Sequence, residues 1–138
     1  MSVASCRVGR MDSDDTRAHS QLLVLRPGDA GYDEELAGFQ TGFTQRPDVI
    51  YAATSADDVV AAVSYAAGAG LPVGVQATGH GLPGTSQGGV LISTRRMDCV
   101  VVDPAARTVR VAAGTRWGQV VEAAAPHGLA PWGYLPRP

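Results

Sequence analysis

Short apolar runs separated by polar turns mark the chain from residue 21 onwards. Runs of this length, bounded by glycine, proline and aspartate, predict buried strands. They lie at 21–25, 49–53, 72–76 and 90–92. Two more runs, at 100–102 and 108–111, flank an Asp-Pro-Ala-Ala-Arg turn and predict a hairpin. Residues 1–20 are polar and aperiodic, and we expect them to form a flexible tail.

Three segments repeat their apolar residues at helical spacing. The first, 32–43, places Tyr32, Leu36, Phe39 and Phe43 on one face. The second follows Ser55, a candidate N-cap, and its expected inner face is Val59, Val60, Val63, Ala66 and Ala67. The third follows Thr115, also a candidate cap, and its expected inner face is Trp117, Val120, Val121 and Ala124.

The order strand, helix, strand between 49 and 76 predicts a βαβ unit with parallel strands. We therefore expect an α+β architecture. Residues 21–138 form an incomplete domain in this interpretation. A first βαβ lobe spans about 46–89, and a second α/β lobe begins at about 90–131.

A glycine-rich stretch, 71–90, leaves the carboxyl end of the second strand of this unit. Glycine allows positive φ and a close approach of backbone amides to a ligand, so such a loop can cradle a phosphate. From the glycines alone, a purely structural turn and a phosphate-binding loop are equally good interpretations of this stretch. His80 stands between Gly79 and Gly81 and belongs to no periodic apolar face. Its loop follows a strand, and ligands of α/β folds tend to bind at such loops. An imidazole is also a competent nucleophile.

Composition narrows the classes of function. The chain has 138 residues, of which 45% are hydrophobic and 17% charged, with a net charge of −2, so a nucleic-acid-binding surface is not expected. The arginines at 95, 96, 107, 110 and 116 are expected to line a solvated hairpin face. The two cysteines, Cys6 and Cys99, lack the spacing of a zinc site. No segment has the length of a membrane span or the apolar core of a signal peptide, so we expect a cytoplasmic protein.

Many separated motifs resemble the FAD-binding PCMH-type domain of the vanillyl-alcohol-oxidase superfamily. The nearest branch is that of the berberine-bridge-enzyme-like FAD-linked oxidases. The resemblance covers about residues 22–131. Its main motifs are Arg46-Pro47-Asp48-Val49-Ile50, Gly70-Leu71-Pro72-Val73, Gly79-His80, Gly88-Gly89-Val90-Leu91-Ile92, Val102-Asp103-Pro104 and His127-Gly128-Leu129-Ala130-Pro131.

The resemblance implies FAD as the cofactor, with the pyrophosphate held by backbone amides of the glycine-rich loop. The implied cofactor-binding residues are Gln76, Ala77, Thr78, Gly79, His80, Gly81, Leu82 and Gly84. It also implies a covalent bond from His80 to the 8α-methyl group of the isoalloxazine. The flavin would accept a hydride from an organic substrate of unknown identity, and dioxygen would reoxidise it. A side chain at Gly79 or Gly84 is expected to weaken FAD binding more than folding.

This chain departs from the family pattern in several places. Gln76 replaces the usual arginine, Ala77 and Thr78 replace glycines, and Gly81 replaces a serine. The substrate domain that holds the catalytic base in relatives has no counterpart here, so no catalytic or metal-binding residue is assigned. Two alternatives to an FAD-linked oxidoreductase portion therefore stay open. One is a non-catalytic remnant or half of a split flavoprotein completed by a C-terminal partner chain, and the other is a phosphate- or nucleotide-binding module without flavin.

Overall fold

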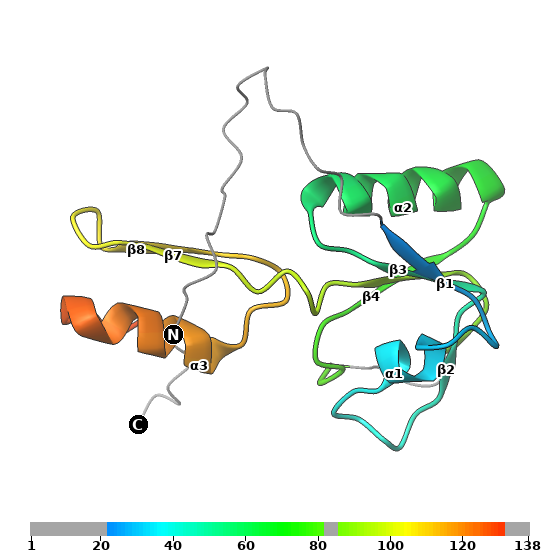
Figure 1. Cartoon of the computed structure of the whole chain (residues 1–138), viewed down its shortest axis with the longest axis horizontal. Coiled ribbons are helices and arrows are strands. Elements are labelled where there is room, and N and C mark those ends of the chain that lie inside the picture. Colours follow the sequence, from blue (N-terminus) through cyan, green and yellow to red (C-terminus); the bar gives the residue numbers. More distant parts are fainter. Residues whose placement is uncertain (1–21, 82–85, 132–138) are drawn as a thin grey trace. The chain divides into compact units, whose positions relative to one another are not determined.

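A computed structural model describes residues 22–81 and 86–131, so the expected tail at 1–20 lies outside the described residues (Figure 1). The chain divides into two compact units, and the division falls between Met97 and Asp98. The N-terminal unit holds a four-stranded sheet with helices, and the C-terminal unit holds a hairpin with one helix. This mixed α/β architecture confirms the predicted fold class.

The sheet of the N-terminal unit has the order β1-β3-β6-β4. Its strands are β1 (Leu23–Leu25), β3 (Val49–Ala52), β6 (Val90–Ser93) and β4 (Val73–Gln76). Strand β1 runs antiparallel to β3, whereas β3, β6 and β4 are parallel. The predicted parallel βαβ unit is therefore present, with β6 inserted between its two strands.

Strand β6 belongs to the first unit, whereas the sequence-based boundary at 89–90 assigned this segment to a second lobe. All four of its residues are buried, as are all four of β3. A run that is apolar on both faces is typical of a strand in the middle of a parallel sheet with both faces covered. The first unit therefore extends one strand beyond the expected boundary.

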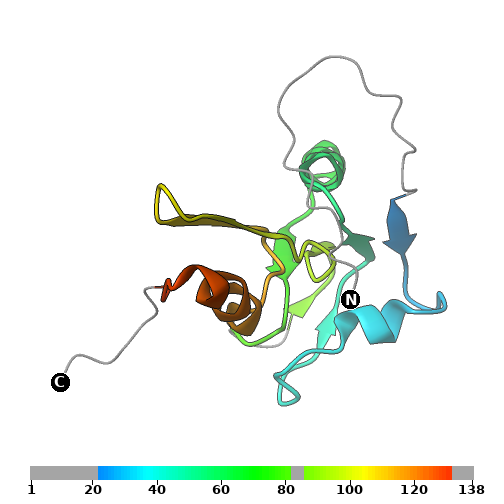
Figure 2. The same ribbon diagram turned by 60° about the vertical axis from the view of Figure 1, so that its left-hand side comes forward.

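Helix α2 (Ala56–Ala69) covers one face of this sheet, and α1 (Tyr32–Leu36) covers the other (Figures 1 and 2). Ala62 and Ala66 are the buried residues of α2, whereas Val60 and Val63 are 62% and 46% exposed. The predicted inner face of this helix was thus partly wrong. Alanines allow the helix backbone to approach the sheet closely, and the valines lie on the outer side.

Helix α1 is much shorter than the predicted segment 32–43. It ends at Leu36, and Ala37 already has an extended conformation with ψ of 128°. The glycine that follows, Gly38, packs its backbone against that of Gly79, which a continuing helix would prevent. Phe39 and Phe43 consequently lie on the surface, at 66% and 42% exposure, rather than in the core. After them, β2 (Gln45–Arg46) pairs in parallel with β5 (Ser86–Gln87).

The C-terminal unit contains the predicted hairpin, formed by β7 (Val100–Asp103) and β8 (Thr108–Val111). Helix α3 (Trp117–Ala124) follows and continues into a 3-10 turn, η1 (Ala125–His127). Val120 and Ala124 are buried as predicted, but Trp117 and Val121 are 53% and 45% exposed. No helix in the described part of the chain is long and apolar enough to cross a membrane.

Candidate functional site

The glycine-rich loop begins directly after Gln76, at the carboxyl end of the parallel strand β4. Ligands of open α/β sheets bind at this end of the strands. The structure describes the loop up to Gly81, so Leu82 and Gly84 of the predicted binding residues lie outside the described residues.

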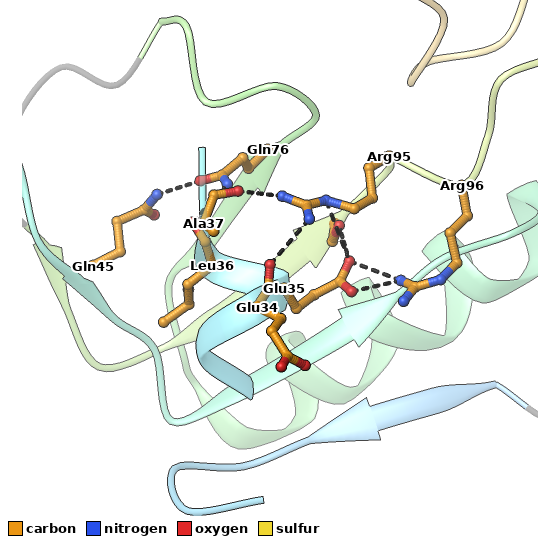
Figure 3. Close-up of polar contacts among 9 residues, drawn as sticks. Glu34, Glu35, Leu36, Ala37, Gln45, Gln76, Arg95 and Arg96 are labelled. Atoms are coloured by element: carbon orange, nitrogen blue, oxygen red, sulfur yellow. Dashed lines mark hydrogen bonds and ion pairs between the residues drawn. The ribbon is translucent and has the colours of Figure 1, made fainter. Parts of the chain in front are cut away.

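The Gln76 side chain fastens the loop to the segment after α1. It is only 4% exposed, and its amide nitrogen donates a hydrogen bond of 3.1 Å to the carbonyl of Leu36. Its amide oxygen accepts a hydrogen bond from the side chain of Gln45 (Figure 3). Both ends of this side chain are therefore engaged within the protein, and its backbone carbonyl accepts a 2.9 Å hydrogen bond from the N–H of Thr94.

The N–H groups of the loop are not paired within the described part of the chain, and of their residues Gly79 is buried whereas Thr78, His80 and Gly81 are exposed. Within the described residues, nothing accepts a hydrogen bond from the backbone N–H of Thr78, Gly79, His80 or Gly81. Gly79 has a φ of 73°, the left-handed conformation that reverses the direction of successive amides. Consecutive unbonded N–H groups around such a residue form a concave anion site. The loop therefore fits the pyrophosphate that the sequence resemblance implies.

Two glycines allow the loop to touch the segment that follows α1. A Cβ on Gly38 would lie 3.1 Å from the Cα of Gly79, and one on Gly79 would lie 3.0 Å from the Cα of Gly38. The N–H of Phe39 donates a 2.8 Å hydrogen bond to the carbonyl of Thr78 at the same crossing. Gly79 thus serves packing as well as any ligand, which the sequence alone did not indicate.

His80 is exposed at the tip of this crossing. Its ring lies on that of Phe39, with centroids 3.6 Å apart and planes inclined by 30°. No described residue makes a hydrogen bond to either nitrogen of the imidazole. His80, the expected attachment point, is therefore both accessible and in contact with another ring on one face.

A cluster that the sequence analysis missed anchors the end of α1. Glu35 is 3% exposed, and its carboxylate pairs with Arg96, whose Nη1 lies 2.7 Å from Oε2. The hydroxyl of Ser93 donates to the same carboxylate, and the Arg95 guanidinium lies 3.8 Å from it. A buried carboxylate requires such cationic and hydrogen-bonding partners.

Arg95 extends this cluster to the backbone (Figure 3). Its guanidinium donates a hydrogen bond of 3.0 Å to the carbonyl of Glu34 and a second hydrogen bond to the carbonyl of Ala37. The expectation that Arg95 and Arg96 line a solvated hairpin face was therefore wrong. A signal was available, because the pair follows the predicted buried strand 90–92 after only two residues and so lies near its carboxyl end.

Comparison with known proteins supports the resemblance. A model of the FAD binding domain family matches residues 47–135. (R)-6-Hydroxynicotine oxidase of Paenarthrobacter nicotinovorans is 35% identical over 109 residues, which cover 78% of this chain and 24% of that protein. An FAD-linked oxidoreductase of Aspergillus fumigatus is 31% identical over 109 residues, covering 78% of this chain and 23% of its own length.

Solved structures agree with this fold. The crystal structure of 6-hydroxy-D-nicotine oxidase from Arthrobacter nicotinovorans superimposes with a TM-score of 0.72 at 34% identity, covering 78% of this chain and 24% of that one. Aclacinomycin oxidoreductase gives a TM-score of 0.64 at 33% identity, covering 74% of this chain and 21% of its own.

The fold and the family match define a mixed α/β unit of the FAD-binding type. The chain belongs to the FAD binding domain family, and it spans about a quarter of the length of the curated relatives it matches.

Proposed function

We propose that this chain is the FAD-binding portion of an FAD-linked oxidoreductase. In this proposal the amides of the loop that follows β4 hold the pyrophosphate, and His80 carries a covalent bond to the flavin. The observation that carries the proposal is the exposed His80 beside four amides that no described residue engages. The family match over residues 47–135 supports FAD as the ligand.

Each part of the loop has a separate task in this function. The backbone N–H groups of Thr78 to Gly81 supply partial positive charge to an anion without a basic side chain. The Gln76 side chain, bonded to Leu36, fixes the start of the loop. His80 supplies a ring nitrogen as the nucleophile. Bound FAD would supply hydride acceptance from an organic substrate, followed by reoxidation by dioxygen.

Loading with FAD tests the proposal. The purified chain is incubated with FAD, desalted and examined for the visible absorption of the flavin, and it is then denatured and run on a gel. We expect a fluorescent band in the parent chain and in His127→Ala, whose histidine lies in η1 of the other unit. We expect His80→Ala to bind flavin but to lose the fluorescent band.

Three outcomes separate the alternatives. Fluorescence that persists in His80→Ala would place the bond on another residue. Visible absorption without any fluorescent band would mean that the chain binds flavin without a covalent bond. Absence of flavin from every sample would favour a remnant or a phosphate-binding module, and titration with pyrophosphate alone would distinguish these two.

A further inference from the structure

We propose that Phe39 is a positioning residue for His80. Its ring supports one face of the imidazole and leaves both ring nitrogens open for reaction. This inference rests on the proposed function, because it assigns Phe39 a part in forming the bond from His80 to the flavin. Phe39 precedes His80 by 41 positions, so the fold alone brings the two rings together.

The contact between the two rings is close. Their centroids are 3.6 Å apart and the planes are inclined by 30°, so the rings face each other in a tilted arrangement. Phe39 is 66% exposed, so burial in the core does not account for its position. Its ring lies outside the core and against the side chain of His80, which the proposed function requires to react.

The backbone that carries Phe39 is fixed on several sides. The N–H of Phe39 is bonded to Thr78, and Gly38 touches Gly79, so Phe39 and His80 lie on two segments in direct contact. Before them, Arg95 binds two carbonyls at the end of α1, and Gln76 binds a third at Leu36. The stack therefore rests on an anchored backbone, although it is made by exposed side chains.

Such support matters because His80 stands between glycines. A histidine on a glycine-flanked loop can turn about both side-chain torsions, and a nucleophile that turns freely spends little time aligned with its target. In the reaction, the unprotonated nitrogen of the His80 ring would form the bond to the 8α carbon, and the other ring nitrogen would release its proton. One C–H bond of the 8α carbon would break, its proton leaving to solvent and its electron pair reducing the flavin, which dioxygen would then reoxidise. Stacking restricts the imidazole without occupying the nitrogen that reacts.

The test compares Phe39→Leu with a matched control, Phe43→Leu. Phe43 is a second exposed phenylalanine of the same segment, and it lines a cavity of about 340 Å³ rather than contacting His80. In the chain without FAD, the ring protons of His80 are followed by NMR and assigned with His80→Gln. The Phe39 ring current should displace them in the parent and in Phe43→Leu. In Phe39→Leu they should return to the positions of a free imidazole.

With FAD supplied, covalent and total flavin are measured over time. We expect Phe39→Leu to bind as much FAD as the parent but to form the covalent bond about tenfold more slowly. Phe43→Leu should match the parent in both quantities, and thermal melting should be similar for all three chains.

The two sets of measurements can fail separately. Unchanged His80 resonances in Phe39→Leu would overturn the inference, as would displaced resonances with an unchanged rate of bond formation. If the parent takes up no FAD, the proposed function fails.

Ethoxyformylation of His80 by diethyl pyrocarbonate then decides the inference. A His80 that reacts as readily in the parent as in Phe39→Leu has accessible nitrogens, whereas a much slower parent would show that Phe39 shields them.

Discussion

Glycine is favoured at positions 38 and 79 because two backbone segments meet there, and a Cβ on either residue would lie only 3.0–3.1 Å from the Cα of the other. Position 79 carries a second constraint, its φ of 73°. A non-glycine residue in this conformation costs about 1–2 kcal/mol. At the residue scale, the loop is therefore shaped by contacts with Gly38 and Phe39 as much as by any ligand.

This predicts a difference between two neighbouring glycines. Gly79→Ala should lower the free energy of unfolding by about 1–3 kcal/mol, because strain adds to a Cβ 3.3 Å from the N–H nitrogen of Phe39. Gly81→Ala is the control, since a Cβ there meets nothing within 4 Å. It should leave stability unchanged or raise it by up to about 1 kcal/mol. Urea unfolding of both variants measures this, and equal losses would contradict the close crossing.

The sequence was informative about the residues that stand alone and uninformative about those that act in pairs. Gly79 and His80 were recognisable as candidates because a glycine-rich loop after a strand has its own local signature. Phe39 was placed on one face of a predicted helix at 32–43, since helical spacing says nothing about a partner 41 positions away. Arg95 and Arg96 were assigned to solvent because the buried carboxylate of Glu35 lies on another element.

At the scale of elements, helix α2 shows how local chemistry fixes a boundary. Ser55 is its N-cap, as predicted, and its hydroxyl accepts a hydrogen bond from the N–H of Asp58. The Asp58 carboxylate accepts in return from the N–H groups of Thr54 and Ser55. Such reciprocal bonds satisfy amides that the first helical turn leaves unpaired. The start of α2 was therefore predictable, whereas the end of α1 depended on a contact with the distant loop.

The cap makes part of the stability dependent on pH. Burial alone would raise the pKa of Asp58, but the hydrogen bonds from Thr54 and Ser55 outweigh it, and the pKa lies below its ordinary value. A lowered folded-state pKa means that this stabilisation is complete above the unfolded value of about 3.9. This stabilisation is lost as the pH falls from the unfolded-state pKa through the lower folded-state pKa of Asp58.

Asp58→Asn should therefore cost about 1 kcal/mol at neutral pH. The difference in the free energy of unfolding between this variant and the parent should shrink as the pH falls below about 4. Chemical unfolding of both chains at neutral and acidic pH measures that difference. A difference that stays constant across this range would show that the charge of Asp58 does not contribute.

For the whole molecule, we expect no oxidase turnover from this chain alone when it is supplied with FAD. Catalysis needs a general base within hydrogen-bond reach of the substrate. Tyr32 donates its hydroxyl to the carbonyl of Pro47, and Tyr51 is buried under α2 with its ring against Tyr65. His127 lies in the other compact unit. None of the described tyrosines makes a ring contact with His80.

Peroxide release measures this expectation. The chain is loaded with FAD and offered a panel of alcohols, sugars and alkaloids, with free FAD as the reference. Release should not exceed that of the free cofactor. Sustained peroxide formation that disappears in His80→Ala would show that a complete active site assembles from this chain.

The position of β6 in the sheet has a consequence for synthesis on the ribosome. Strand β6 is one of the two inner strands, and it is the last of the four to be made, because β1, β3 and β4 all precede it in the sequence. Strands β3 and β4 pair with β6 and not with each other, so neither finds its parallel neighbour until Val90–Ser93 has been translated. The first residue of β6 comes 14 positions after the last residue of β4, which corresponds to about 1–3 s of elongation. During that interval both strands leave an edge unpaired, and this is when the nascent chain is most exposed to pairing with a neighbour.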